Sequence, residues 1–371
     1  MNSRNFFVIL WCSFFVMNPL RLLWLPFVPF YAFVVAVRNW LFDAQVLRSQ
    51  KSQTPTICVG NLSVGGSGKT PHVEYLIRLL KNEYKVCTLS RGYGRKSKGY
   101  VLAKDVVSSN LLGDEPMQYA QKFPDISVCV DVDRRRAIRN LKTDAPNTEL
   151  ILLDDAFQYR KINAGLNILL TDYFRPYYDD YLLPVGNLRE SKQSAKRADI
   201  IVVTKCPTIL SSIVKDDILE NLNPRQNQSV YFSYLKHGQL LHLDGSVCEI
   251  NKDVFNHFVV LAGIYNPYPL VEHLRDFSKD VKLFQFRDHH EFTKFDLRRV
   301  RKHFLDYFCN HKYIVTTEKD LMRLKDSPAF AVISDLPICY VPIEVEFHKD
   351  DKGDKNKFDE QVLEFVKKHK K

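Results

Sequence analysis

The chain has 371 residues, of which 45% are apolar, and its formal net charge is +10. This length and composition exclude a largely disordered chain and allow one large domain or two medium ones. The positive charge indicates an anionic partner, and charge alone leaves nucleic acid, an acidic lipid surface and a phosphorylated substrate open. The eight cysteines are scattered singly, with no C-x-x-C and no metal-like grouping with histidine. This pattern favours a reduced, cytoplasmic setting.

Two apolar runs dominate residues 1–37, one from Phe6 to Val16 and one from Leu22 to Val37. Neither run fits a transmembrane helix well. A helix that spans a membrane needs about 20 consecutive apolar residues, and the second run contains Pro26 and Pro29. The residues that follow also lack the small-residue cleavage site of a signal peptide. A buried core helix is a weaker alternative, because few polar positions interrupt the runs.

We therefore predict that residues 1–40 form a hydrophobic membrane-associating segment. Arginine and tryptophan flank it at positions suited to the headgroup level of a membrane: Arg21, Trp24, Arg38 and Trp40. A single membrane span remains the alternative to a helix lying in the interface. If translation started at Met17, the segment from that residue onward would still form a complete membrane anchor.

Short apolar runs alternate with helix-like stretches over the rest of the chain. Most are apolar throughout, as expected for strands buried on both faces of a parallel sheet. The first series comprises Thr56–Gly60, Val86–Leu89, Ile126–Val130, Leu150–Leu153, Leu166–Leu170 and Ile200–Val203. After a loop rich in Tyr, Pro and charge, the second comprises Phe258–Gly263, Val281–Phe286 and Tyr313–Thr316. This alternation predicts an α/β architecture with crossover helices.

A glycine-rich loop after the first strand is the most informative motif. The eight residues that we expect to bind nucleotide are Ser63, Val64, Gly65, Gly66, Ser67, Gly68, Lys69 and Thr70. Glycines let backbone N–H groups point at phosphates, and the following helix adds its positive end. Lys69 would reach the β- and γ-phosphates and Thr70 would bind Mg²⁺. Ser63 stands where the strict P-loop pattern has its first glycine.

A P-loop NTPase-type parallel-sheet domain with a second, smaller α/β lobe is therefore the predicted fold class, preceded by the N-terminal membrane-associating helix. The expected boundaries are 41–175 for the P-loop domain and 176–345 for the second lobe. Residues 346–371 should form a charged C-terminal segment with an amphipathic helix from Phe358 to Val366.

Two consecutive carboxylates, Asp154 and Asp155, follow four apolar residues at the end of another strand. A lone Asp there is commonly a turn residue, but a pair in a chain with a P-loop indicates a metal and phosphate site. The spacing does not say which of the two contacts Mg²⁺. Together with the P-loop, the pair indicates a protein that uses a nucleoside triphosphate.

Three classes of nucleotide-using protein compete. Membrane-partitioning ATPases have a similar loop, but they carry a second lysine where this chain has Val64. GTPases read guanine with Asn-Lys-x-Asp, and the comparable Thr204-Lys205-Cys206-Pro207 lacks the aspartate. A kinase of a small molecule or lipid remains, and a non-catalytic membrane-binding module would leave the P-loop unexplained.

A kinase also needs positive groups for the transferred phosphate and a base for the acceptor hydroxyl. Arginines follow two of the strands, and Arg91, Arg95 and Arg134 are the substrate-binding candidates among them. Each is equally well explained as part of a solvated basic face. The candidate bases are the carboxylates of Gly113-Asp114-Glu115-Pro116 and the histidines of Asp288-His289-His290.

In their order along the chain, these motifs resemble those of the tetraacyldisaccharide 4′-kinases, the lipid A 4′-kinases of Gram-negative bacteria. The resemblance runs from about Leu20 to Leu324. The matching segments are Gly60-Asn61, Val64 to Pro71, Leu89 to Arg95, Gly113 to Pro116, Asp133-Arg134, Leu153 to Arg160, Leu183-Pro184, Gly186, Leu188 to Glu190, Thr204-Lys205, Asp288-His289 and Thr317 to Asp320.

The resemblance implies transfer of the γ-phosphate of ATP, with Mg²⁺, to the 4′-hydroxyl of tetraacyldisaccharide 1-phosphate. This reaction would take place at the cytoplasmic face of the inner membrane. The partners would be the lipid substrate and an anionic membrane surface, with no nucleic acid and no obligate protein partner.

Matching positions also imply residue roles. Asp114 would be the base, or part of a relay with His289, and Lys69 would assist catalysis. Four residues would organise Mg²⁺ and the phosphates: Thr70, Glu115, Asp154 and Asp155. Arg189 and Glu190 would shape the active-site cleft, and Gln158 would join the substrate-binding arginines.

Overall fold

The computed structural model describes residues 19–103, 108–264, 266–288, 290–349, 353–354 and 356–369. It divides into two compact units, each built from separate stretches of the chain. Unit 1 comprises Met1–Lys69, Asp155–Ser233 and His348–Lys371, and unit 2 comprises Thr70–Asp154 and Tyr234–Phe347. The chain alternates between the units, whereas the domain ranges expected from the sequence are contiguous. Those four ranges stay a prediction.

Unit 1 contains four parallel strands in the order β10-β9-β8-β2. Their bounds are Thr56–Asn61 for β2, Leu166–Asp172 for β8, Ile200–Thr204 for β9 and Ser229–His237 for β10. β2 and β9 are buried along their whole length, which explains why the central residues of both are apolar. A short parallel pair joins β1 (Gln50–Lys51) to β7 (Ile162–Asn163).

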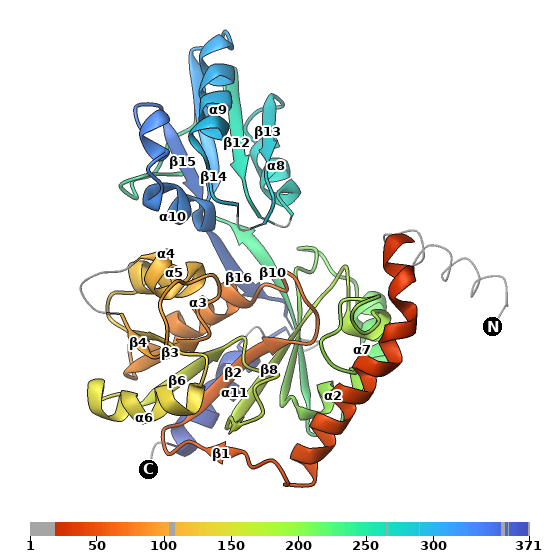
Figure 1. Cartoon of the computed structure of the whole chain (residues 1–371). Coiled ribbons are helices and arrows are strands. Elements are labelled where there is room, and N and C mark those ends of the chain that lie inside the picture. Colours follow the sequence, from red (N-terminus) through yellow and green to blue (C-terminus); the bar gives the residue numbers. More distant parts are fainter. Residues whose placement is uncertain are drawn as a thin grey trace, which may run out of the picture. The chain divides into compact units, whose positions relative to one another are not determined.

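The helices of unit 1 include the predicted N-terminal segment. A 3₁₀ helix η1 (Pro19–Phe27) leads into α2 (Val28–Asp43), and α7 (Ser212–Leu222) and α11 (Lys357–His369) follow later in the chain (Figure 1). Pro29 is compatible with α2 because it stands in the first turn, where the proline N–H would have no helical acceptor. α2 ends at Asp43, three residues beyond the expected end of the membrane-associating segment at residue 40. The apolar run from Phe6 to Val16 lies outside the described residues.

Unit 2 contains two sheets. In the first, β6 (Leu150–Asp154), β3 (Val86–Ser90) and β5 (Ser127–Val130) are parallel, and β4 (Val101–Leu102) adds an antiparallel edge. The associated helices are α3 (Lys69–Leu80), α4 (Ser109–Leu112), α5 (Asp114–Lys122) and α6 (Arg134–Asp144). β16 (Ile343–Phe347) also belongs to this unit.

The second sheet of unit 2 has the strand order β11-β15-β14-β12-β13. The strands are Leu241–His242 (β11), Asn256–Ala262 (β12), Val281–Gln285 (β13), His311–Thr317 (β14) and Ile338–Val341 (β15), and only β11 runs antiparallel. The helices are α8 (Tyr268–Arg275), α9 (Lys294–Asp306) and α10 (Glu318–Asp326) (Figure 1). One core cluster includes α8 residues and the other includes α9 residues, so alternate side chains of β12 pack against different helices.

The structure confirms the α/β fold class and the apolar strands predicted in both series. The sequence analysis did not predict β10, because its side chains are mostly half-buried and polar residues interrupt its apolar ones. The stretch from Phe174 to Arg197 is irregular as expected, with two short 3₁₀ helices, η2 (Tyr177–Asp179) and η3 (Lys192–Arg197).

Candidate active site

The glycine-rich loop connects the end of β2 to the first residue of α3, as the motif predicts. Gly65 and Gly68 have φ values of +107° and +81°, a region that favours glycine. If a Cβ atom were added to Gly65, no heavy atom of the described residues, apart from Gly65 and its two neighbours in the chain, would lie within 4 Å of it. Val64 donates its backbone N–H to the Asn187 carbonyl at 2.8 Å, which ties the loop to a second segment of unit 1.

Other polar groups of unit 1 hold the base of this loop. The Thr204 hydroxyl donates to the Ser67 carbonyl at 3.0 Å, and Lys205 donates to the Gly66 carbonyl. Lys205 also forms an ion pair with Asp172 at 2.6 Å. The Ser67 hydroxyl, by contrast, is buried and has no hydrogen-bond partner within the described chain. A buried hydroxyl without a partner is costly, so this loop fits a ligand that supplies an acceptor such as a phosphate oxygen.

Lys69 points toward two polar side chains of unit 1. Its ammonium lies 3.3 Å from the Asn61 amide oxygen and 3.8 Å from an Asp155 oxygen. Asp155 adopts a positive φ of 47° directly after β6 and is paired with Arg189 at 3.1 Å. The structure therefore brings together Lys69, Asp155 and Arg189, three residues that are far apart in the sequence.

Arg189 belongs to a segment that helix α2 contacts directly. The Tyr31 hydroxyl donates to the Arg189 carbonyl at 2.9 Å, and Arg38 donates to the Gln158 carbonyl at 2.6 Å. Arg38 also lies 3.4 Å from Glu190, a carboxylate whose side chain is only 1% exposed.

Glu190 has a second arginine partner, Arg197, at 2.6 Å. Two guanidinium groups therefore neutralise this buried charge, as a buried carboxylate requires. Gln158 donates its side-chain amide to the Asn61 carbonyl at 2.8 Å, next to the P-loop. These contacts make Gln158 and Glu190 parts of the framework around Arg189.

Thr70 and Asp154 meet through a buried tyrosine of unit 2. The Tyr119 hydroxyl donates to Asp154 at 3.2 Å and also hydrogen-bonds with Thr70. Burial, followed by the charge of Asp154, raises the pKa of Tyr119 well above its ordinary value, so the hydroxyl stays protonated. The P-loop threonine and the carboxylate at the end of β6 are thus neighbours of one side chain.

Asp114 begins helix α5 and is held by an arginine that the sequence analysis did not select. A Cβ at Gly113 would lie 2.6 Å from the Tyr93 carbonyl oxygen, and the φ of Gly113 is +91°, so the turn before Asp114 requires glycine. Arg323 of α10 donates from Nε to Asp114 at 2.8 Å.

The same guanidinium contacts Asp320 and the Gly263 carbonyl, both at 3.1 Å. Asp320 is fully buried and accepts hydrogen bonds from the Gly263 N–H at 3.0 Å and the Thr317 hydroxyl at 2.8 Å. Burial raises the pKa of Asp320, and the charge of Arg323 opposes that shift. Arg323 is thereby fixed in position, and it fixes the Asp114 carboxylate in turn.

Neighbouring charges on α5 are also paired with α10. Glu115 lies 3.1 Å from Lys319, and Lys122 lies 2.6 Å from Glu318. The Thr-Glu-Lys-Asp segment, which entered the sequence analysis only through the family resemblance, therefore supplies charged partners to α5. The predicted metal-binding role of Glu115 stays a prediction.

The three candidate substrate arginines of unit 2 occupy different environments. Arg91 is exposed directly after β3. Arg95 donates to the Gly99 carbonyl at 2.6 Å and so supports its own loop. Arg134 is buried at the start of α6 and donates to the Val132 carbonyl. The substrate-binding role of these three arginines stays a prediction.

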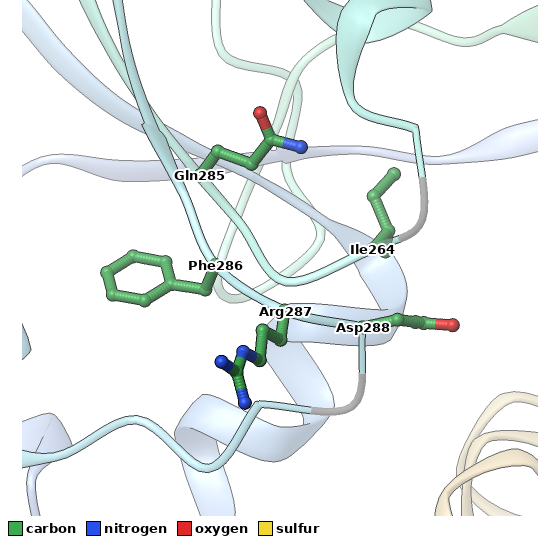
Figure 2. Close-up of a pocket in the computed structure, with 5 residues that line it drawn as sticks. All are labelled: Ile264, Gln285, Phe286, Arg287 and Asp288. Atoms are coloured by element: carbon green, nitrogen blue, oxygen red, sulfur yellow. The ribbon is translucent and has the colours of Figure 1, made fainter. Parts of the chain in front are cut away.

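A pocket of about 420 Å³ lies in unit 2 near the ends of β12 and β13. Figure 2 shows the residues that line it, which are Ile264, Gln285, Phe286, Arg287 and Asp288. The side chains of Phe286 and Asp288 point to opposite sides of the segment that carries them (Figure 2). His289, the predicted relay partner of Asp114, lies outside the described residues.

Known proteins resemble this chain over nearly its whole length. The family model described as tetraacyldisaccharide-1-P 4′-kinase matches residues 20–366. Among curated relatives, the tetraacyldisaccharide 4′-kinase of Flavobacterium johnsoniae is 42% identical, with 95% of this chain and 98% of that protein covered. The Bacteroides thetaiotaomicron protein of the same name is 41% identical, with 91% of each chain covered.

A solved structure shows the same fold. The crystal structure of LpxK from Aquifex aeolicus in complex with ATP superposes with a TM-score of 0.71 at 28% identity, covering 94% of this chain and 99% of that one. The P-loop, the paired aspartates and the matching motifs are therefore found in a chain that resembles known kinases over nearly its whole length. The chain belongs to the tetraacyldisaccharide-1-P 4′-kinase family.

Proposed function

We propose that this kinase of lipid A biosynthesis binds ATP at the loop from Ser63 to Thr70 and transfers the γ-phosphate to the 4′-hydroxyl of tetraacyldisaccharide 1-phosphate. The observation that carries the proposal is the cluster of Lys69, Asp155 and Arg189 beside a P-loop whose buried Ser67 hydroxyl has no hydrogen-bond partner among the described residues. Lys69 and Arg189 are both paired with Asp155. Bound phosphate oxygens would offer them further anionic partners.

Thr70 and Asp154 are the residues that we propose to hold Mg²⁺. Hydroxyl and carboxylate oxygens are the ligands that this ion prefers, and both residues hydrogen-bond with Tyr119. When bound, the ion would neutralise phosphate charge during transfer. Asp155 has a different environment because it pairs with Lys69 and Arg189. We therefore assign it to positioning these cations, although the sequence analysis also considered it a metal ligand.

Asp114 is the group that we propose to accept the proton of the attacking 4′-hydroxyl. Asp114 is the first residue of α5. Arg323 donates to one of its oxygens at 2.8 Å, which orients the carboxylate. The proposed relay with His289 rests on the family resemblance.

Helix α2 carries features of a membrane-associating helix. The segment Leu23–Asp43 is long and apolar enough to cross a membrane, and only 6% of its apolar window is buried. The side chains of Phe30, Phe33 and Trp40 are 71%, 66% and 62% exposed. The opposite stripe, with Tyr31, Arg38 and Phe42, faces the protein. We propose that the exposed stripe enters the inner membrane from its cytoplasmic side, close to the acyl chains of the substrate.

Replacing Phe30 and Phe33 together with aspartate should weaken binding to anionic phospholipid vesicles by about 10-fold or more for each ring, because burying a phenylalanine contributes about 1.5 kcal/mol or more. Vesicle co-sedimentation measures this change. Phe308→Asp alters an exposed phenylalanine of unit 2 and should bind as the unaltered protein does. Equal binding by all three proteins would show that this stripe does not enter the membrane.

Arg38→Gln should lower kcat by roughly 10-fold to 10²-fold, because small displacements of a catalytic group have large effects. Arg38 contacts the Gln158 carbonyl and Glu190, and its loss would loosen the segment that holds Arg189. Vesicle binding should stay unchanged, because Arg38 belongs to the protein-facing stripe. The exposed Arg48→Gln, placed just after α2, is the matched control. A parallel loss of vesicle binding would assign Arg38 to the membrane contact.

Phosphate transfer tests the proposal directly. The purified chain in detergent is incubated with radiolabelled ATP, Mg²⁺ and tetraacyldisaccharide 1-phosphate, and the lipid is analysed for label. A labelled bisphosphorylated lipid is the expected product. Hydrolysis of ATP without labelled lipid would instead favour the hypothesis that the protein is a membrane-partitioning ATPase.

A further inference from the structure

A cluster of cysteine and histidine side chains lies in the second sheet of unit 2, separate from every residue assigned to phosphate transfer. The side chains of His242, Cys248 and Cys339 place their ligand atoms within 4.8 Å of one another. Cys248 and Cys339 are 4% and 0% exposed, and both belong to the apolar core beneath this sheet. His242 is half-buried, so the cluster reaches solvent on one side.

The backbone fixes this arrangement. His242 and Cys339 are directly opposite each other in the antiparallel pairing of β11 with β15, and the Cys339 Sγ lies 3.7 Å from the His242 Nδ1. The chain then turns back after His242, and the Cys248 N–H donates to the Leu240 carbonyl at 2.8 Å. The thiols of Cys248 and Cys339 are themselves hydrogen-bonded. Three ligand atoms thus converge on segments whose backbone is held by hydrogen bonds.

We propose that His242, Cys248 and Cys339 form a zinc-binding site that joins β11 and the following turn to β15. Ligands about 2.0–2.3 Å from a tetrahedral Zn²⁺ lie roughly 3.5–3.8 Å apart, which is the separation seen between Cys339 and His242. Two cysteines and one histidine leave a fourth position, and the solvent side of His242 admits a water to it.

Charge favours Zn²⁺ over copper(I), a monovalent ion that also binds thiolates. Binding breaks two S–H bonds, forms two zinc–sulfur bonds and releases two protons to solvent. Two thiolates, a neutral imidazole and a divalent ion sum to zero charge, whereas copper(I) would leave a net negative charge in an apolar core. Because net charge is costly to bury in an apolar core, the neutral zinc site is favoured over the negatively charged copper(I) site.

Metal titration of the tag-free full chain tests the site. The protein is reduced, stripped with a chelator and titrated with Cd²⁺, whose bonds to thiolates absorb in the ultraviolet, and Zn²⁺ is then added as competitor. We expect one equivalent of Cd²⁺ to produce this absorption and Zn²⁺ to displace it. Mg²⁺ at the P-loop has oxygen ligands and contributes no thiolate signal.

Two variants and one control identify the ligands. Cys248→Ser and His242→Gln should each weaken binding by about 10²-fold or more, since even indirect loss of ligand support costs 10-fold to 10²-fold. Cys309→Ser, a partly exposed cysteine outside the cluster, should bind as the unaltered chain does. His242→Gln changes a half-buried residue and avoids a cavity in the core. Equal binding in all variants, or no thiolate absorption, overturns the proposal, as does a disulfide between Cys248 and Cys339 in the protein purified without reductant.

Discussion

Lys69→Met is expected to lower phosphate transfer by about 10²-fold to 10³-fold, the loss typical of removing one group that stabilises transition-state charge. Methionine keeps the unbranched chain and removes the ammonium. The Lys69 side chain is 16% exposed and its charge is directed at Asn61 and Asp155. The radiolabel assay described above measures the change, and circular dichroism checks the fold.

The matched control for this variant is Lys85→Met, which removes an exposed lysine near the start of β3. It should leave transfer unchanged. ATP binding by Lys69→Met, measured by calorimetry, should weaken less than turnover falls, because backbone N–H groups of the P-loop still contact the phosphates. Transfer at the normal rate in Lys69→Met would remove this loop from the mechanism.

Asp114→Asn is expected to lower kcat by about 10²-fold to 10⁴-fold, with a smaller effect on nucleotide binding. Asparagine keeps the shape of the side chain and its contact with Arg323, but it cannot accept the hydroxyl proton. Steady-state kinetics with the lipid acceptor measure kcat, and calorimetry measures the affinity for ATP. Asp125→Asn changes a partly exposed carboxylate beyond the end of α5 and serves as the control.

Arg323→Lys separates positioning from proton transfer. Lysine keeps the charge, but it cannot contact Asp114, Asp320 and the Gly263 carbonyl with one rigid planar group. The kcat of this variant should fall less than that of Asp114→Asn, and its pH profile should shift because the surroundings of Asp114 change. Normal turnover in Asp114→Asn would mean that another group accepts the proton.

Much of the fold could be predicted because the apolar pattern is local. Strands such as β2 and β9 are buried on both faces, so their central positions are apolar and the run is visible without any knowledge of its neighbours. β10 was missed because half-buried strands carry mixed residues. The interleaving of the two units also escaped prediction, because it depends on which strands pair across long stretches of chain.

The candidate site was predictable where the residues lie within one motif. The P-loop and the pair Asp154 and Asp155 are contiguous segments with a fixed relation to a strand, so their chemistry can be inferred from spacing. The different environments of the two aspartates could not be inferred from the sequence. Asp155 takes a positive φ that directs it toward Lys69 and Arg189, whereas Asp154 ends the strand beside Tyr119.

The sequence by itself determined the α/β class, the nucleotide loop, the apolar N-terminal helix and, through its series of motifs, the family. Only the tertiary structure decided that Arg323 holds Asp114, that α2 supports Arg189, and that two singly scattered cysteines converge with His242. The physical reason is range: hydrophobic periodicity and turn chemistry act between near neighbours in the chain, whereas ion pairs and ligand clusters join residues that strand pairing brings together over tens to hundreds of positions.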